Sequence, residues 1–574
     1  MKNMALALAA ACLAAMGQVP SEDARWRAVE GTNFAYPMPV YASRAEWEAR
    51  KTHLRKQILA SAGLLPMPRR GPVRADIFGR IDRDGYSIEK VALETMPGYY
   101  LGGNLYRPRG KQGKFPGVLT PHGHWKHGRL ENTDLASIPG RSINLARQGY
   151  VVFAYDMVGY NDTRQTPHAF GSPVEQLWNF GPLGLQLWNS LRAADFLASL
   201  PDVDAGRLGA TGASGGGTQT FLLAAVDDRI RADVPVNMVS GIMQGGSPCE
   251  NAPGLRHDTF NVEFAAMMAP RPMLLVSATG DWTRNVPAIE FPAIRKVYEL
   301  YGAAGQVQTV QFDSPHNYHR GSREAMYTFF GKTLLAGNGA SVKEQPFTVE
   351  RDEDMLVWSG RAMPANALRG EDAVFAEWRK LTRVAKPDRE AMRFALSVEN
   401  PAKVLSERDG EFIALSRPGR EDRVPGIYLK GKGIPLLVID SEGGAAARAT
   451  VPANGRPALY LDAFNTGSAR GERNTEAAHF LTFQRTDSQN RVQDILTALA
   501  WLRTTTKGPV ELLGVGDGAL WSVFAAAVYD GKLRLTESPE GFEGTDAEMT
   551  GRFFVPGIQR VGGWKAALAL SRLR

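Results

Sequence analysis

Short apolar runs alternate with helix-like segments from about residue 85 onward. The clearest runs are residues 117–120, 150–155, 234–238 and 272–276. Strands that are apolar on both faces are typical of a parallel sheet with helices on both sides. Residues 185–200 have apolar side chains at helical spacing. The pattern predicts an α/β fold, in which polar residues at the carboxyl ends of the strands are candidates for a functional site.

Residues 212–216 read Gly-Ala-Ser-Gly-Gly, which is a complete G-x-S-x-G motif. A strand-like run precedes the motif, and residues 218–226 after it are helix-like. A strand, a tight turn and a helix form a nucleophile elbow, which exposes the serine hydroxyl at the edge of a sheet. The alternative is a glycine-rich turn that contains a serine by chance. The flanking strand and helix favour Ser214 as a nucleophile.

Two later residues complete a candidate for a catalytic triad. A serine hydroxyl is a weak nucleophile, so it needs a base within reach and a carboxylate that orients the base. Asp281 follows the run 272–276, and His316 follows a further strand-like run, residues 307–312. The order serine, acid, histidine is that of a hydrolase triad built on one parallel sheet. We expect Asp281 and His316 to be the acid and the base, with His319 as the alternative base.

The oxyanion of an acyl-transfer reaction needs two fixed hydrogen-bond donors. The backbone N–H of Gly215, directly after the serine, is one candidate. The other is the backbone N–H of His124, in the loop after the run 117–120. A metal cluster of His122, His124 and His127 is the alternative, but no carboxylate ligand accompanies it at a suitable spacing. We therefore expect no metal and no cofactor.

Five segments resemble secreted bacterial α/β-hydrolases of the acetyl xylan esterase-like, dienelactone hydrolase-like or cephalosporin deacetylase-like kind. They are PHGHW (121–125), TGASGGGTQTFLLAAVDD (211–228), CENAPGLR (249–256), SATGDWT (277–283) and PHNY (315–318). The resemblance covers roughly residues 85–335. It implies Ser214 as nucleophile, Asp281 as acid, His316 as base and His124 as an oxyanion donor. It leaves the substrate open.

Residues 245–256 follow the run 234–238 and are expected to border the pocket. The candidates for binding polar groups of a substrate are Glu250, Asn251 and Arg256, together with Trp125 beside His124. The alternative for the tract 245–256 is a loop that is held by its own hydrogen bonds.

The second half of the chain repeats the order of elements of the first half. Residues 434–440, 457–462 and 494–503 match two strands and a helix, and residues 510–518 match the elbow. Gly516 stands where the elbow has its serine, and no segment follows that would supply the acid and the base. We expect an α/β-hydrolase domain followed by a second, degenerate and truncated α/β-hydrolase-like domain without catalytic activity.

A chain of 574 residues is too long for one ordinary domain. The predicted parts are a signal peptide (1–17), an N-terminal extension of mixed helical segments (18–84), a catalytic domain (85–340), a linker with helices (341–420) and the non-catalytic domain (421–574). The net charge of +7 comes without a dense lysine and arginine tract, so no nucleic-acid partner is expected. No apolar run of about 18 residues follows the start, so no membrane span is expected.

The first 17 residues combine one lysine, an apolar segment and small residues before a cleavage point after Gly17. This combination predicts a signal peptide and a secreted or periplasmic protein. Lipidation of Cys12 is the alternative, although Ala9 stands where a lipobox has leucine. Once Cys12 is removed, Cys249 has no partner for an intramolecular disulfide.

These features predict a secreted serine ester hydrolase that acts through an acyl-enzyme. The expected substrate is a small ester or an acetylated saccharide, such as an acetylated plant polysaccharide or oligosaccharide. Three alternatives remain: a serine peptidase on the same fold, an esterase for methyl uronates, and a binding or structural protein with a silent triad.

Overall fold

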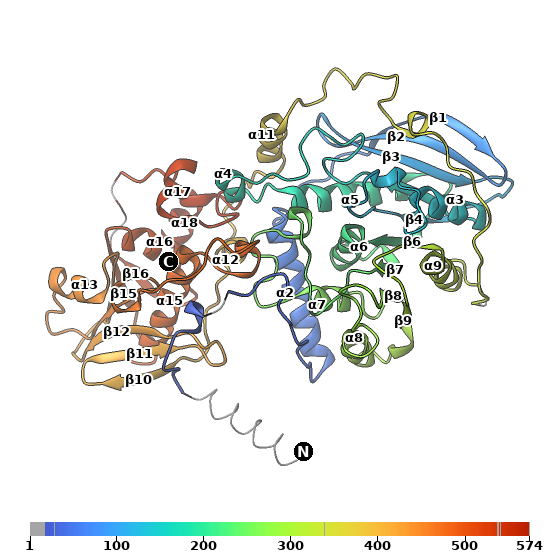
Figure 1. The fold of residues 1–574 in the computed structure, drawn as a ribbon. Coiled ribbons are helices and arrows are strands. Elements are labelled where there is room, and N and C mark those ends of the chain that lie inside the picture. Colours follow the sequence, from blue (N-terminus) through green and yellow to red (C-terminus); the bar gives the residue numbers. More distant parts are fainter. Residues whose placement is uncertain (1–17, 28, 338, 537–538, 540, 573–574) are drawn as a thin grey trace, which may run out of the picture. The chain divides into compact units, whose positions relative to one another are not determined.

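The computed structural model describes residues 18–27, 29–337, 339–536, 539 and 541–572 (Figure 1). The predicted signal peptide and Cys12 lie outside these residues. The chain divides into two compact units, each with its own sheet. The nine-stranded unit comprises Gly31–Glu175 and Asn179–Thr382, and the seven-stranded unit comprises the described parts of Met1–Glu30, Gln176–Trp178 and Arg383–Arg574. No helix in the described part of the chain is long and apolar enough to cross a membrane.

The nine-stranded sheet begins with an antiparallel meander and continues as a parallel sheet. Its strands lie in the order β1 (Arg74–Arg83), β2 (Tyr86–Met96), β3 (Tyr99–Pro108), β5 (Val151–Tyr155), β4 (Phe115–Leu119), β6 (Val203–Ala213), β7 (Ile230–Val236), β8 (Met273–Ala278) and β9 (Val307–Phe312). The pairings from β5 to β9 are all parallel. Two-residue turns join the first three strands, and their glycines Gly85 and Gly98 have φ of +76° and +74°. These turns suit glycine because other residues rarely adopt a positive φ.

Helices cover both faces of this sheet (Figure 1). The buried cluster on one face includes residues of α2 (Arg44–Ser61), α5 (Pro182–Ser199), α6 (Gly215–Val226), α7 (Asn261–Ala266), α8 (Glu290–Glu299) and α11 (Glu371–Leu381). The cluster on the other face includes residues of α3 (Ile138–Gln148), α9 (Arg320–Thr333) and α10 (Asp352–Met355). Successive strand residues alternate between the two, since Phe153 belongs to the first cluster and Val152 to the second. This two-sided cover confirms the predicted α/β fold.

The seven-stranded sheet repeats the topology of the first seven strands of the larger sheet. Its strands lie in the order β10 (Leu405–Asp409), β11 (Phe412–Ser416), β12 (Val424–Leu429), β14 (Ala458–Leu461), β13 (Leu436–Asp440), β15 (Val510–Val515) and β16 (Leu533–Leu535). The first four strands pair antiparallel, and the pairings from β14 to β16 are parallel. Within the described residues, no strand of this sheet corresponds to β8 or β9. The second sheet is therefore a shortened copy of the first.

The helices of the seven-stranded unit are shorter on average. They are α12 (Arg389–Leu396), α13 (Gly444–Thr450), α14 (Phe480–Phe483), α15 (Asp487–Leu502), α16 (Gly518–Val528), α17 (Asp546–Arg552) and α18 (Gly563–Arg572), while the short α4 (Pro173–Leu177) leads into Gln176–Trp178. Of the segment predicted as a linker, residues 341–382 belong to the nine-stranded unit and residues 383–420 to the seven-stranded unit.

The turn between strand and helix is the same in both units. Residue 214 has φ of +59° between β6 and α6, and residue 516 has φ of +58° between β15 and α16. A Cβ on Gly212 would lie 2.5 Å from a backbone oxygen of the following helix, and a Cβ on Gly514 would lie 2.4 Å from the Cα of Ala519. Both turns therefore depend on the same close approach of strand and helix. The copy keeps the elbow and has glycine in place of serine.

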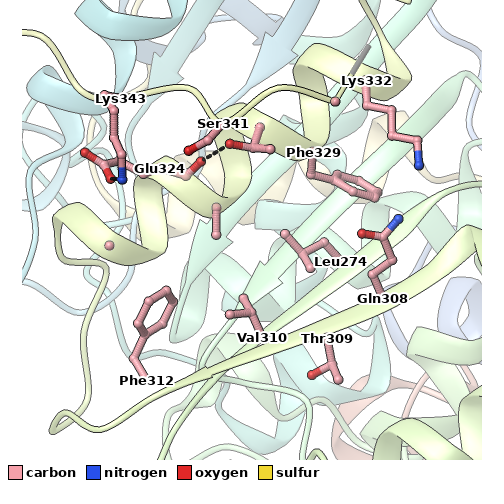
Figure 2. A pocket seen from close by; sticks show the side chains of 14 residues that line it. Leu274, Gln308, Thr309, Val310, Phe312, Glu324, Phe329, Lys332, Ser341 and Lys343 are labelled. Carbon is pink, nitrogen blue, oxygen red and sulfur yellow. Dashed lines mark hydrogen bonds and ion pairs between the residues drawn. The ribbon is translucent and has the colours of Figure 1, made fainter. Parts of the chain in front are cut away.

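A groove of about 700 Å³ lies where α9 crosses the edge of the nine-stranded sheet. Figure 2 shows Leu274 and Val310 on the strands, Phe329 on α9, and the ion pair of Lys343 with Glu324 at one side. None of the sequence-predicted site residues lines this groove. The candidate site is instead assembled from the loops that follow the parallel strands.

The close approach at Gly514 makes a prediction about the seven-stranded unit. Gly514→Ala places a Cβ against backbone that cannot move away, and we expect the free energy of unfolding to fall by about 1–3 kcal/mol. Urea denaturation followed by tryptophan fluorescence measures this change. Gly508→Ala is the matched control, because a Cβ there meets only the Thr506 hydroxyl at 3.5 Å. Equal denaturation midpoints for the two variants would contradict the shared-turn interpretation.

Candidate active site

Ser214 occupies a strained turn at the carboxyl end of β6. Its φ of 59° and ψ of −130° are unfavourable for any residue with a side chain. The backbone holds this conformation, because the Ser214 N–H donates to the Val236 carbonyl at 3.1 Å and its own carbonyl accepts from Gly217 and Thr218. The residue is partly exposed. The turn therefore presents the hydroxyl at the edge of the sheet.

Two glycines make this turn possible. A Cβ on Gly212 would lie 2.5 Å from the Gly216 carbonyl oxygen, and one on Gly216 would lie 2.6 Å from the Pro121 carbonyl oxygen. Side chains are excluded at both positions because backbone occupies the space. The G-x-S-x-G spacing thus has a steric cause in this protein.

Asp281 and His316 form a hydrogen-bonded pair at the ends of neighbouring strands. Asp281 follows β8, His316 follows β9, and the His316 Nδ1–H donates to Asp281 Oδ2 at 2.8 Å. The other oxygen, Oδ1, accepts from the Thr283 N–H at 2.7 Å and from its hydroxyl at 2.5 Å. With the carboxylate fixed in this way, Nε2 of His316 carries the free lone pair. That nitrogen is buried and has no hydrogen-bond partner among the described residues.

Two indoles flank the His316 ring. The Trp282 and Trp125 ring centroids lie 4.5 Å and 5.9 Å from it. The Trp125 loop also reaches Ser214, since a Cβ on Gly123 would lie 2.9 Å from the Ser214 Cβ and 3.4 Å from Trp125 Nε1. The Ser214 hydroxyl makes no hydrogen bond within the described residues, and such bonds often tighten only when substrate binds. Serine, histidine and indoles thus share one edge of the sheet.

His319, the alternative base, has a different environment. It is the N-cap of α9, where its Nδ1 accepts a hydrogen bond from the Ser322 N–H at 3.1 Å. Its ring packs edge-on against Phe312, with the ring centroids 5.0 Å apart. Burial lowers the pKa of His319. The histidine that is hydrogen-bonded to Asp281 is His316, and His319 is engaged as a helix cap.

His122 holds the loop that carries His124. Its Nε2 accepts from the Met157 N–H at 2.9 Å, so Nδ1 carries the proton and donates to the Gly123 carbonyl at 2.7 Å. Burial lowers the pKa of His122 to about 3, so the ring is neutral. Both of its nitrogens are therefore occupied within the protein. This leaves no ring nitrogen of His122 for the metal cluster with His124 and His127 that the sequence offered as an alternative.

The residues of the two predicted oxyanion donors, Gly215 and His124, are in contact through the His124 ring. Gly215 is the first residue of α6, so its N–H has no acceptor within the helix and lies at the positive end of the helix dipole. A Cβ on Gly215 would lie 2.7 Å from Cε1 of His124, which places the imidazole directly against the start of the helix. Whether both N–H groups bind an oxyanion stays a prediction.

The polar residues predicted to bind substrate from the tract 245–256 are engaged inside that loop. Glu250 accepts from the Ser247 N–H at 3.2 Å and from the Thr218 hydroxyl at 3.2 Å. Arg256 donates to Asn251 Oδ1 at 2.8 Å and to the Glu250 carbonyl at 3.0 Å. Burial lowers the pKa of Arg256 to about 10. Most of these contacts lie within the loop, and the bond from Thr218 ties Glu250 to α6. A role of the three residues in binding substrate stays a prediction.

No family model matches the chain. The solved structure named Methylesterase BT1017 is 32% identical, with a TM-score of 0.51, over 62% of this chain and 78% of that protein. The chain belongs to the α/β-hydrolase esterases. The Bacillus subtilis (strain 168) protein named "Putative hydrolase YtaP" is 28% identical over 46% of this chain and 92% of its own length. A glucuronoyl esterase from Solibacter usitatus is 17% identical, with a TM-score of 0.40, over 52% of this chain and 97% of that one.

Sequence reasoning missed two residues beside the active site of this esterase. Nε2 of His168 lies 3.2 Å from Nε2 of His124, and Sγ of Cys249 lies 3.1 Å from the same nitrogen. Burial lowers the pKa of His124 to about 4. His168 and Cys249 come from loops with no recognisable spacing relative to His124, so no motif could have pointed to this cluster.

A buried ion network of the esterase was also missed. Arg129 pairs with Asp156 and Asp162, and these side chains are at most 3% exposed. Its Nε donates to Asn104 Oδ1 at 2.8 Å. Burial raises the pKa of Asp156 to about 6 even though the Arg129 charge opposes the shift. The network lies close to His122, because a Cβ on Gly128, the residue before Arg129, would lie 3.2 Å from the His122 ring.

Removing the cation of this network should destabilise the esterase strongly. Arg129→Met leaves two buried carboxylates without a partner, and we expect the free energy of unfolding to fall by about 3–5 kcal/mol. Arg80→Met is the control, because the pair of Arg80 with Asp82 is about half exposed and is worth about 1 kcal/mol at most. Urea denaturation of both variants measures the difference. Similar losses in the two variants would refute the importance of the network.

Proposed function

We propose that this esterase is a serine carboxylic-ester hydrolase with Ser214 as its nucleophile. The observation that carries the proposal is the strained backbone at Ser214, with φ of 59°, on the same sheet edge as the Asp281–His316 pair. Strained backbone of this kind persists where function requires it. The residues stand in the roles that the G-x-S-x-G motif and the chain order imply.

In the proposed reaction His316 Nε2 takes the proton of Ser214 as the hydroxyl attacks the ester carbonyl. Asp281 holds the Nδ1–H and stabilises the imidazolium that forms. The N–H groups of Gly215 and His124 donate hydrogen bonds to the negatively charged oxygen of the tetrahedral intermediate. His316 then gives its proton to the leaving alcohol. A water molecule, deprotonated by His316, attacks the acyl-enzyme and releases the acid.

The acyl and alcohol parts of the substrate are open to two interpretations. The 32% identity to a methylesterase favours a methyl ester of a sugar carboxylate, which leaves the saccharide on the acyl side and releases methanol. The sequence-based prediction was an acetylated saccharide, which leaves an acetyl group on Ser214. Indole faces suit sugar rings as apolar platforms, and Trp125 and Trp282 beside His316 offer two. Membership of an esterase family speaks against the serine peptidase alternative.

The predicted signal peptide, residues 1–17, supports a location outside the cytoplasm. We infer that the enzyme works in the periplasm or after secretion, where it would meet polymeric carbohydrate esters.

The assignment of the triad predicts a graded series of variants. With p-nitrophenyl acetate as substrate, we expect Ser214→Ala and His316→Ala to lower kcat by at least about 10⁴-fold. Asp281→Asn should lower kcat by about 10⁴-fold, because the imidazole loses its orienting carboxylate. His319→Ala is the control, and its loss should be one of stability, about 1 kcal/mol for a helix cap. If His319→Ala abolishes activity while His316→Ala does not, the base has been assigned wrongly.

The substrate class is decided by the product that is released. We expect methanol from a methyl-esterified polyuronate at a higher kcat/KM than acetate from acetylated xylan. Both rates should vanish in Ser214→Ala, which separates enzymatic release from spontaneous hydrolysis. Faster release of acetate would reject the methyl ester and restore the acetylated saccharide as the substrate.

A further inference from the structure

Three side chains from three separate loops converge beside the start of α6. His124 lies after β4, His168 lies between β5 and α4, and Cys249 lies between β7 and α7. Nε2 of His124 is 3.2 Å from Nε2 of His168 and 3.1 Å from Sγ of Cys249. One potential ligand atom from each residue lies within 4.8 Å of the others. We propose that these residues form a binding site for a thiophilic divalent cation, with Zn²⁺ as the expected ion.

The spacing of the atoms fits a shared ion. Zn²⁺ lies about 2.0–2.1 Å from imidazole nitrogen and about 2.3 Å from thiolate sulfur, usually in a tetrahedron. Two ligand atoms at those bond lengths are then about 3.3–3.6 Å apart. The observed separations of 3.2 Å and 3.1 Å need only a few tenths of an ångström of adjustment. The third pair of ligand atoms, from His168 and Cys249, is at most 4.8 Å apart and has to come closer if it exceeds the tetrahedral separation.

The orientation of His168 also fits a ligand. Its Nδ1–H donates to the Val158 carbonyl at 2.6 Å, so its Nε2 directs a lone pair at the cluster. A histidine that ligates a metal commonly donates its other N–H to a backbone carbonyl, which fixes the tautomer and the ring orientation. The hydrogen bond to Val158 therefore orients His168 as a ligand before any ion binds.

The donor types select the class of ion. Two imidazoles and a thiol favour zinc and similar soft or borderline ions over magnesium or calcium, which prefer oxygen ligands. Binding would replace the S–H bond of Cys249 by a sulfur–metal bond and release the proton to solvent. His124 is exposed, so a water molecule can complete the tetrahedron.

The site lies beside the proposed nucleophile. The His124 ring lies against Gly215, the residue after the proposed nucleophile. An ion bound to His124, His168 and Cys249 would tie together the three loops that surround that point. This site differs from the cluster of His122, His124 and His127 considered from the sequence, because the residues that share it are neighbours only in space.

The test is a titration of the full chain, without a histidine tag, with Co²⁺ and Zn²⁺. We expect one equivalent of Co²⁺ to produce a thiolate-to-cobalt charge-transfer absorption, and Zn²⁺ to displace it. Cys249→Ser should abolish that absorption, and His168→Ala should weaken cobalt binding by at least about 10-fold. His127→Ala is the matched control, a histidine of the same loop outside the cluster. The readout needs no esterase activity, so its failure is distinguishable from failure of the proposed reaction.

Each outcome of this titration decides the proposal. Loss of the absorption in Cys249→Ser and weaker binding in His168→Ala, with His127→Ala unchanged, supports the site. Cobalt binding without a thiolate band, or binding that survives both variants, overturns it, as does an absence of binding to the folded wild-type chain. The two substitutions lie on different loops and circular dichroism reports whether each variant is folded, so a misfolded Cys249→Ser leaves His168→Ala to decide.

Discussion

The active site depends on the close approach of backbone segments around residues 212–216, where there is no room for side chains at two positions. At Gly212 and Gly216 the strand, the helix and the loop at Pro121 approach so closely that a Cβ would overlap backbone atoms. Between these two glycines Ser214 has a positive φ, which costs on the order of 1–3 kcal/mol for a residue with a side chain. The burial of apolar side chains of β6 and α6 in the hydrophobic core offsets that cost. In return, the hydroxyl stands clear of the sheet.

Comparison of the two sheets shows which features of the turn belong to the fold and which accompany the candidate catalytic residues. Residue 516 has nearly the same φ as residue 214, yet it is glycine, for which that conformation carries no strain. The turn therefore belongs to the architecture, and strain arises only where a serine is placed on it. The described part of the seven-stranded sheet also has no counterpart of β8 and β9, the strands that carry Asp281 and His316. The strained serine turn and the strands that carry Asp281 and His316 thus occur together in the nine-stranded unit, and the described part of the second sheet has neither.

Patterns that are local in the chain could be predicted from the sequence, and those that arise in space could not. The parallel strands were predictable because burial on both faces leaves continuous apolar runs. Ser214, Asp281 and His316 were found because each follows a strand, and parallel strands bring their ends to one edge. The strand β1 lies in the N-terminal extension (18–84), which was predicted to consist of mixed helical segments. The strand was missed because most of its residues are exposed and leave no apolar run. Arg129 gave no signal, because its partners Asp156 and Asp162 lie in a loop about 30 residues further along the chain and have no fixed spacing to it.

The histidines of the loop after β4 show how burial assigns roles that spacing cannot. In the sequence His122, His124 and His127 look alike and suggest one cluster. In the structure His122 is enclosed with both nitrogens hydrogen-bonded, His124 faces His168 and Cys249, and His127 is exposed. Only the middle one meets ligand-type atoms from other loops. Because the neutral, buried His122 fixes the Gly123 carbonyl, it also sets where the next residue places its backbone N–H and its ring. The fixed position of His122 thus helps to position His124, which follows Gly123.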